Sequence, residues 1–557
     1  MAVDETAAPL KATGPENEKE KQDAVAKPAL PPAGITYPGV WHYSLLAFAL
    51  LLAMFLVALD VSIIATAIPT ITAEFHSVSQ IGWYGSAFFM SLAAFQAFWG
   101  KAYKYFALKI VFLSCIGIFE IGSLMAALAP NSNVLILGRA IQGLGGAGIT
   151  GGCYTIFAFI TPPKNMPAIL GLSSSVWSCS SVLGPLLGGL FTQDVTWRWC
   201  FWVNLPIGGT TMLILLFVFK TPAHSRMAHT TWKEVPFLFD LPGIVTIVAA
   251  LVCLLVAFEE GGVLRLWTDS VPIGLVVGFV LLMGLLVVIE WKQGEKAMIV
   301  LRIMKRRTIL ILALFNLTAQ AAGFARTYNL PIYFQAVQGV SPSQSGIRML
   351  PTVLTTSLFS FIGSVALGKL GYYQPFLLVG AVFLTIGSGM LYTLGPESSA
   401  AHYIGYQILA SIGSGLVIQI NVVVAQAITP RPDMAVTIAL VLLWQFVGGT
   451  IGVSAAQNIL NNLLLKSLPV NSRNITAAKV LAAGTTSLHD AFPDPADFST
   501  VVNAYMKGIR AAWIWGIILS GLAFLIAFGA EWRSIKVEDI QKRAKEKAII
   551  TNRANIG

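Results

Sequence analysis

The sequence predicts an all-α integral membrane protein with fourteen transmembrane helices and with both termini in the cytoplasm. Its 557 residues are 56% hydrophobic and only 11% charged, whereas a soluble domain has roughly 25% charged residues. Apolar stretches of about 20 residues, each long enough to cross a bilayer as a helix, alternate with short polar breaks. Lys and Arg collect in every second break. The composition excludes a soluble enzyme, a disordered scaffold and a nucleic-acid-binding protein.

The first element is a polar segment, residues 1–43, which is rich in Ala, Pro, Lys and Glu and is expected to be disordered. Fourteen apolar segments follow it. We expect membrane-spanning helices at 44–68, 80–100, 109–129, 134–160, 168–191, 199–219, 240–259, 271–291, 308–334, 347–368, 375–395, 403–428, 434–460 and 510–530. A basic loop at 292–307 is expected to be the hinge between two halves, with the helix pair 240–291 inserted before it.

The distribution of Lys and Arg predicts how these helices are oriented. With both tails cytoplasmic, only three basic residues, Arg198, Arg265 and Arg348, fall in short external loops. Fifteen fall in internal loops: Lys101, Lys104, Lys109, Lys164, Lys220, Arg226, Lys233, Lys292, Lys296, Arg302, Lys305, Arg306, Arg307, Lys369 and Arg431. Because excess Lys and Arg marks cytoplasmic loops, this bias supports both the orientation and the even number of helices.

One long external segment, 461–507, separates the last two predicted helices. It contains Asn474-Ile475-Thr476, a sequon for N-glycosylation on the predicted extracellular side. A second sequon, at Asn316, lies within a predicted span and is expected to stay unmodified. Glycosylation is therefore predicted at Asn474.

Four ionisable residues lie inside predicted spans: Asp60, Glu120, Arg139 and Arg326. Such residues cost about 2.5–3.5 kcal/mol each in a membrane and usually have a function. Counted at about 1.5 Å per residue, Asp60 in the first helix and Arg139 in the fourth lie at similar depth in the outer half. We interpret them either as a proton-coupled pair or as a static ion pair that only fixes helix packing.

The other two intramembrane charges have different interpretations. Glu120 lies near the middle of the third helix, where it either binds a proton or a cation or is a neutral, hydrogen-bonded acid of the core. Arg326 lies near the outer end of the ninth helix and is expected to extend to the membrane interface. The six histidines are scattered through tails and loops without metal-ligand spacing, so no metal, cofactor or enzymatic activity is expected.

Small residues predict close helix packing in two spans. One face of the fourth helix contains Arg139, Gln142, Gly143 and Gly146. The fifth helix has Ser180, Gly184 and Gly188 at a spacing of four, with Pro185 and Gly189 beside them. Small residues at this spacing let two helix backbones approach closely, and the proline bends its helix.

Six amide side chains lie in or beside the helices of the second half: Gln335, Gln338, Gln419, Asn421, Gln426 and Gln445. They either face a polar cavity or bond neighbouring helices. The candidate cavity residues among them are Gln335, Gln419, Asn421 and Gln445.

Five segments, in order along the chain, carry a resemblance to a known family. They are Leu59-Asp60-Val61-Ser62-Ile63-Ile64 with Ala67-Ile68-Pro69; Arg139 with Gln142-Gly143; Gly184-Pro185-Leu186-Leu187-Gly188-Gly189; Trp197-Arg198-Trp199-Cys200-Phe201-Trp202-Val203-Asn204-Leu205-Pro206-Ile207-Gly208; and Leu330-Pro331-Ile332-Tyr333-Phe334-Gln335. With them, residues 44–530 resemble the major facilitator superfamily, and within it the fourteen-helix drug–proton antiporter branch that is common among fungal toxin and multidrug efflux pumps.

One loop departs from the pattern of that family. Between helices two and three the family usually has Gly-x-Leu-Ala-Asp-x-x-Gly-Arg-Lys, whereas this chain has Gly100-Lys101-Ala102-Tyr103-Lys104-Tyr105-Phe106-Ala107-Leu108-Lys109. Lys104 replaces the acid, Ala107 the second glycine and Leu108 the arginine. The family's charge relay, which gates the inward-closed state, is therefore not expected in its usual form.

The resemblance implies a major facilitator fold, in which two six-helix bundles rock about a central site and two helices are inserted between them. The implied domains are a disordered tail at 1–43, an N-terminal bundle at 44–219 and an inserted helix pair with a basic linker at 220–307. A C-terminal bundle at 308–530, including the extracellular loop 461–507, and a basic cytoplasmic tail at 531–557 follow.

The resemblance further implies a proton-coupled efflux pump that exports a hydrophobic or amphipathic small molecule, such as a secondary metabolite, a toxin or a drug. Its partners would be the bilayer, the substrate and protons, and it would act as a monomer in the plasma membrane or, alternatively, the vacuolar membrane. Asp60, Arg139 and Glu120 are the candidates for proton coupling. Gly184, Pro185, Gly188 and Gly189 would shape the helix packing that favours export. The alternative function is uptake of a nutrient such as a siderophore or an amino acid.

Overall fold

The computed structural model describes residues 37–75, 80–221, 239–469, 474–485, 488–536 and 539. Most of the two predicted tails, 1–43 and 531–557, lies outside the described residues, as do Arg226 and Lys233 of the predicted inner loops. In the described ranges the chain is helical, with two isolated β-bridges and no strand. The predicted all-α class is therefore confirmed.

The first half is built from six spans. Its helices are α2 (Val40–Phe75), α3 (Ile81–Ala94), α4 (Gln96–Tyr105), α5 (Leu108–Ala127), α6 (Ser132–Ile160), α7 (Met166–Leu190), α8 (Trp199–Trp202) and α9 (Asn204–Val218). The inserted pair follows as α11 (Leu241–Glu260) and α12 (Ser270–Gln293), and the short helix α13 (Leu301–Met304) leads into the second half.

The second half contains six further spans. Its helices are α14 (Arg307–Ile332), α15 (Pro342–Arg348), α16 (Leu350–Leu370), α17 (Gln374–Tyr392), α18 (Ala400–Ile418), α19 (Ile420–Ile428), α20 (Arg431–Lys466) and α23 (Pro495–Ala527). The short helices α21 (Ala477–Ala483) and α22 (Leu488–Ala491) lie between the last two spans.

Thirteen of the described helices are long and apolar enough to cross a membrane. The predicted second span is not among them because it is broken at Phe95, where α3 ends and α4 begins. Hydrogen bonds from Phe95 N to Ser91 O and from Trp99 N to Phe95 O, both 3.1 Å, continue the backbone pattern through the break. The two helices together make the fourteenth span.

Helix ends follow local caps and differ from the predicted bounds at the long loop. At the start of α6 the side chain of Asn131 accepts the N–H of Val134 at 3.1 Å, and at the start of α23 Asp494 accepts the N–H of Ala496 at 3.2 Å. Because α20 continues to Lys466 and this cap starts α23 at Pro495, the segment between the last two spans is shorter than the predicted 461–507.

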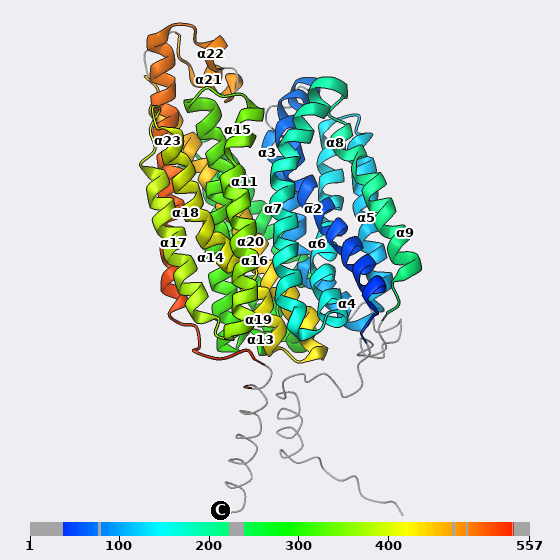
Figure 1. Cartoon of the computed structure of the whole chain (residues 1–557). Helices are drawn as coiled ribbons and strands as arrows, with labels where there is room; N and C mark the ends of the chain where they lie inside the picture. Colours follow the sequence, from blue (N-terminus) through cyan, green and yellow to red (C-terminus); the bar gives the residue numbers. More distant parts are fainter. Residues whose placement is uncertain are drawn as a thin grey trace, which may run out of the picture.

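The two ends of the bundle differ in what they contain. In Figure 1, α2 begins and α23 ends at the lower end, where α4, α13 and α19 also lie. We name this the terminal end. The opposite end contains α8, α15, α21 and α22 (Figure 1). The described part of the chain thus starts and finishes on one side of the bundle, as an even number of spans requires.

The two halves contact each other along α7 with α16 and along α4 with α20. Glycines make this approach possible. A Cβ at Gly171 of α7 would lie 2.8 Å from the Cα of Phe361 in α16, and a Cβ at Gly100 of α4 would collide with Ala439 of α20. Both glycines lie near the terminal ends of their helices, so the halves are packed together at that end.

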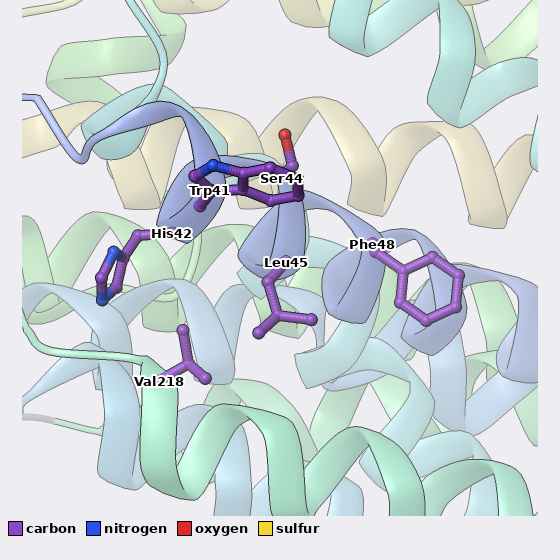
Figure 2. A pocket seen from close by; sticks show the side chains of 6 residues that line it. All are labelled: Trp41, His42, Ser44, Leu45, Phe48 and Val218. Atoms are coloured by element: carbon purple, nitrogen blue, oxygen red, sulfur yellow. The ribbon is translucent and has the colours of Figure 1, made fainter.

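The outer surface of the bundle is apolar, as contact with lipid requires. Helix α12 buries only Pro272, Leu286 and Glu290. At the terminal end, a groove between α2 and α9 is lined by Trp41, His42, Ser44, Leu45, Phe48 and Val218 (Figure 2). Trp41 is 88% exposed and Phe48 is 55% exposed, so this groove lies on the outer surface of the bundle.

Candidate functional site

Helix α6 positions the candidate site because its glycines let it lie against two neighbouring helices. A Cβ at Gly143 would collide with the backbone oxygen of Phe88 in α3, and a Cβ at Gly145 would lie 2.5 Å from the backbone nitrogen of Phe119 in α5. This close packing brings Arg139 and Gln142 of α6 within reach of α2, α3 and α5.

Asp60 of α2 lies at the centre of a buried polar network. Its side chain is fully buried and forms an ion pair with Arg139, whose side chain is 1% exposed. Its Oδ1 also accepts hydrogen bonds from Gln142 Nε2 at 2.9 Å and from Asn204 Nδ2 of α9 at 3.0 Å. The predicted proximity of Asp60 to Arg139 is thus observed, and three side chains from two helices, α6 and α9, donate to one carboxylate.

The same network holds the arginine in place from other directions. Arg139 donates from Nε to the backbone oxygen of Tyr84 at 2.9 Å and from Nη1 to Gln142 Oε1 at 2.9 Å. Its guanidinium lies over the ring of Phe88, 4.5 Å from the centroid. Arg139 therefore keeps neutral partners even if the charge of Asp60 is removed.

Ser123 of α5 completes the network, which we name the Asp60 network: Asp60, Ser123, Arg139, Gln142 and Asn204. The Ser123 hydroxyl accepts from Gln142 Nε2 at 2.8 Å and from Asn204 Nδ2 at 3.2 Å. Analysis of the sequence did not single out Ser123 or Asn204 as site residues. Each is a neutral polar residue in a predicted span, and the available signal was that Asn204 lies in one of the five segments that carry the family resemblance.

The arrangement is a buried ion pair whose two members also have neutral hydrogen-bond partners. A buried ion pair with satisfied hydrogen bonds is tolerated in a dry interior, whereas one of its charges left alone is strongly unfavourable. Protonating the Asp60 carboxylate would remove its attraction for Arg139. The arginine would keep its hydrogen bonds to Tyr84 and Gln142.

Glu120 lies on the same helix as Ser123 but is not bonded into the network. Its carboxylate oxygens have no hydrogen-bond partner in the described part of the chain. They face α9, where a Cβ at Gly208 would collide with them. Glu120 is thus separate from the ion pair and contacts a different part of α9.

At the terminal end, the loop that departs from the family pattern, residues 100–109, contributes Lys104 to a second charged group. Lys104 of α4 forms an ion pair with Asp433 of α20 at 3.1 Å, and Arg302 of α13 contacts the other oxygen of Asp433 at 3.0 Å. Arg302 also pairs with Glu295 at 2.7 Å. Hydrogen bonds to Glu295 and Asp433 raise the pKa of Arg302. We name Lys104, Glu295, Arg302 and Asp433 the terminal-end cluster; it joins the first half, the linker and the second half.

Comparison with protein families identifies this architecture. The model of the Major Facilitator Superfamily matches residues 50–453, which is most of the chain. The chain belongs to the major facilitator superfamily. The predicted fold of two six-helix bundles with an inserted pair is confirmed by this match together with the helical structure described above. It is a transporter fold with many membrane spans.

Several curated relatives of this major facilitator protein are fungal proteins named as exporters or efflux pumps. A dehydrocurvularin exporter of Alternaria cinerariae is 36% identical over 537 residues, which covers 96% of this chain and 92% of the relative. The MFS-type efflux pump MFS1 of Arthroderma benhamiae is 37% identical over 534 residues, covering 95% and 99%. Among solved structures, the proton:xylose symporter XylE has a TM-score of 0.59 at 12% identity, covering 90% of this chain and 99% of that one. This last likeness concerns the fold alone.

In this major facilitator protein, the fifth-helix motif packs against the helix of Asp60. A Cβ at Gly184 would lie 2.7 Å from the Cβ of Ser62, and a Cβ at Gly188 would collide with the backbone oxygen of Ile63. The hydroxyl of Ser62 donates to the backbone oxygen of Ser180 at 2.9 Å. Gly189 differs, because a Cβ there would meet nothing within 4 Å. Pro185 lies inside α7, as predicted.

The four candidate cavity residues fall in three different places. Gln419 Nε2 donates to Tyr154 Oη of the first half at 3.1 Å. Asn421 donates to Asn316 of α14 at 3.0 Å, and Asn316 in turn lies 3.5 Å from Gln445 Oε1. Gln335 accepts from Thr485 at 3.1 Å, beyond the end of α14. Each therefore bonds a neighbouring side chain, and whether any of them also lines a cavity stays a prediction.

The two sequons lie in contrasting surroundings. Asn474 is exposed between α20 and α21 at the opposite end, where its Nδ2 donates to Asp497 at 3.1 Å. Asn316 is fully buried in α14 and donates to the backbone oxygen of Val441 at 3.0 Å. In the described ranges, no group of three or more His, Cys, Asp or Glu side chains is placed to hold a metal ion.

Proposed function

We propose that this protein exports a hydrophobic or amphipathic small molecule across the plasma membrane, or alternatively the vacuolar membrane, in exchange for protons. The observation that carries the proposal is the buried Asp60 network, in which one carboxylate receives donors from α6 and α9 and pairs with Arg139. The direction of transport is supported by the names of the relatives, which are exporters and efflux pumps. They favour export over nutrient uptake.

The proton enters the mechanism at the Asp60 carboxylate. In its charged form the carboxylate attracts Arg139 and accepts from Gln142 and Asn204. When it gains a proton it becomes neutral and its attraction for Arg139 is lost, which favours a different arrangement of α2 and α6. Each tenfold difference in proton affinity between two arrangements contributes about 1.4 kcal/mol to their equilibrium. A hundredfold difference in proton affinity would change their ratio by about the same factor.

Movement of α2 can reach the second half through α7. Ser62 and Ile63, which follow Asp60 in α2, contact Gly184 and Gly188 of α7. Helix α7 in turn packs on α16, where a Cβ at Gly171 would touch Phe361. We infer that protonation at Asp60 changes how α7 slides on α16, and that this motion rocks one half against the other.

The terminal-end cluster is the proposed gate on the cytoplasmic side. Lys104 and Arg302 both hold Asp433, and Tyr154 of the first half accepts from Gln419 of the second. These contacts must separate before a substrate can enter from that end. The proposed orientation, with the terminal end cytoplasmic, is supported by the excess of Lys and Arg in the loops of that end.

Efflux from proteoliposomes tests the coupling. Vesicles are loaded with dehydrocurvularin, the compound named for one relative, or with one of a panel of amphipathic dyes, and efflux is followed with and without an imposed proton gradient. Wild type should export at least one compound faster with the gradient, and Asp60→Asn should lose that acceleration. Asp269→Asn, at an exposed aspartate between α11 and α12, should behave like wild type. If Asp60→Asn still responds to the gradient, the proton is carried elsewhere and Glu120 is the next candidate.

A further inference from the structure

Arg326 of α14 is a buried cation that the proposed proton cycle does not use. It is 5% exposed. Its Nη2 donates to Ser414 Oγ at 2.8 Å, and its Nη1 donates to the backbone oxygen of Ala410 at 3.4 Å, both on α18. The sequence-based expectation that it extends to the membrane interface is wrong, because the guanidinium turns inward to α18. Both of its partners are neutral.

The two halves use a buried arginine in corresponding ways but with different partners. Helices α2 and α6 are the first and fourth spans of the first half, and α14 and α18 are the first and fourth spans of the second. Arg139 joins the first pair through Asp60, and Arg326 joins the second pair through Ser414. Asp60 and Arg326 each lie about twenty residues, or roughly 30 Å, from the terminal end of their helix. Ser414 thus has, beside Arg326, the place that the carboxylate of Asp60 has beside Arg139.

The charge of Arg326 has no internal counterpart. In the part of the chain that the structure describes, Arg326 belongs to none of the ion pairs. A guanidinium in a membrane interior is costly unless an anion accompanies it. Its planar set of N–H donors matches a carboxylate or another planar anion with two contacts. An anionic ligand would supply the negative charge that the protein does not place beside Arg326.

Phe324, two residues before Arg326 in α14, faces the first half, whereas Arg326 itself points to α18. The ring of Phe324 packs edge-on against Phe89 of α3, with centroids 5.9 Å apart. A Cβ at Gly449 of α20 would lie 3.0 Å from the ring of Phe324. A molecule that passes between the two halves therefore passes this segment of α14.

We propose that Arg326 binds the carboxylate or phenolate group of the transported molecule, so that the preferred substrates are amphipathic organic acids. The proposal rests on the proposed export function and names its substrate class. The anion of the substrate takes, for Arg326, the place that Asp60 takes for Arg139. Neutral and cationic compounds lack this contact and bind less tightly.

The test measures binding to the purified protein in detergent, without a proton gradient. The probes are fluorescein, an anionic dye, and rhodamine 123, a cationic dye with the same ring frame, each followed by fluorescence anisotropy. Wild type should prefer fluorescein. Arg326→Gln should weaken fluorescein binding about tenfold or more, the loss expected for one charged hydrogen-bonded contact, and leave rhodamine 123 nearly unchanged. Arg326→Lys should retain part of the preference.

A second variant keeps the arginine and removes only its free charge. Ser414→Asp would give Arg326 an internal carboxylate like that of Asp60, and it should abolish the preference for fluorescein although both helices keep their contact. Ser414→Ala, which removes a partner without adding charge, should keep the preference. Arg510→Gln, at an exposed arginine of α23 that bonds the backbone oxygen of Leu394, is the matched control and should match wild type.

The outcomes separate this proposal from the proposed function. Equal binding of the two dyes by wild type, or an unchanged preference in both Arg326→Gln and Ser414→Asp, would overturn the organic-acid proposal. A variant that loses both dyes equally would assign Arg326 to helix packing alone. Because no gradient is used, loss of proton-driven efflux in other experiments would leave this result untouched, and the reverse holds as well.

Discussion

Among single residues, Asn204 shows what sequence analysis can miss at a buried site. The pairing of Asp60 with Arg139 was predictable because both are charged and lie at similar depth in their helices. Asn204 is neutral, and it reaches Asp60 only because α9 packs against α2 and α5 in the folded protein. No spacing rule within one helix contains that information.

The contribution of Asn204 can be measured by its removal. Asn204→Ala takes one donor from Asp60 and one from Ser123 in a buried network, which should lower the free energy of unfolding by about 1–3 kcal/mol. Thermal unfolding in detergent should show a lower midpoint, and proton-driven efflux should slow. Asn461→Ala, at an asparagine that accepts from Gln457 on the same helix, serves as the control. An unchanged midpoint for Asn204→Ala would mean that water replaces the amide.

Glu74 gives a residue-scale prediction for pH. It lies beyond the apolar part of α2, and hydrogen bonds from Arg198 and then Trp197 lower its pKa from the ordinary value of 4.5. A carboxylate whose pKa is lowered by folding stabilises the protein above its ordinary pKa and loses this effect as the pH falls through the lowered pKa. The thermal midpoint of wild type should therefore exceed that of Glu74→Gln at pH 7.

The difference between these two midpoints should shrink as the buffer is acidified below about pH 4.5. The contact is partly exposed, since the Glu74 side chain is 43% exposed, so added salt should also reduce the difference. A gap that is constant from pH 7 to acid would show that the ion pair is not its source.

At the scale of helices, α7 shows how a motif in the sequence becomes a contact. The spacing of Gly184 and Gly188 predicted that another helix approaches closely, and the helix that does so is α2. The spacing could not predict which helix this is, because that depends on how all six spans of the first half pack together. The spacing of four does distinguish Gly188 from Gly189, which lies outside that row and faces open space.

That distinction makes a matched pair of variants. Gly188→Leu would force a branched side chain against Ile63 and Thr66 of α2, at a cost of about 1–3 kcal/mol for overpacking, and export should fall while the protein still reaches the membrane. Gly189→Leu adds the same side chain one residue later and should export like wild type. Equal export by the two variants, at equal expression, would remove α7 packing from the mechanism.

The terminal-end cluster predicts a variant with a loosened cytoplasmic end. In the wild type, Lys104 and Arg302 both pair with Asp433 and hold the two halves together. Lys104→Glu replaces one of these cations with a negative charge that repels Asp433. Hydrogen exchange followed by mass spectrometry should then be faster in α4 and in the first turns of α20. Lys109→Glu alters a lysine that bonds within the first half and should leave exchange there unchanged. Equal protection in both variants would show that apolar packing alone closes this end.

For the whole molecule, the fold was predictable further than the site. Apolar length gave the spans, and the bias of Lys and Arg gave an even number of them, because both signals repeat along the whole chain. The break of the second span at Phe95 left no such signal, since no Pro or Gly adjoins it in the sequence. The direction in which Arg326 turns was also hidden, because it depends on a hydroxyl about ninety residues away in α18.

The orientation of the whole molecule is tested at its sequons. Asn474 is exposed at the end opposite to the termini, and Asn316 is buried in a span, so only the first should carry a sugar if the termini are cytoplasmic. Glycosidase treatment should shift the mobility of wild type but not that of Asn474→Gln. A shift that persists in Asn474→Gln would place the sugar elsewhere and reverse the proposed topology.

The reversed polarity of the terminal-end cluster has a consequence for the ancestry of this protein. The family pattern has an acid where this chain has Lys104. An acid at position 104 would therefore lie against Asp433 of α20 and repel it. The loop and α20 can therefore change only together, or through a neutral residue at one of the two positions. A chimera that takes its first half from a relative with the acidic loop would place that acid against Asp433.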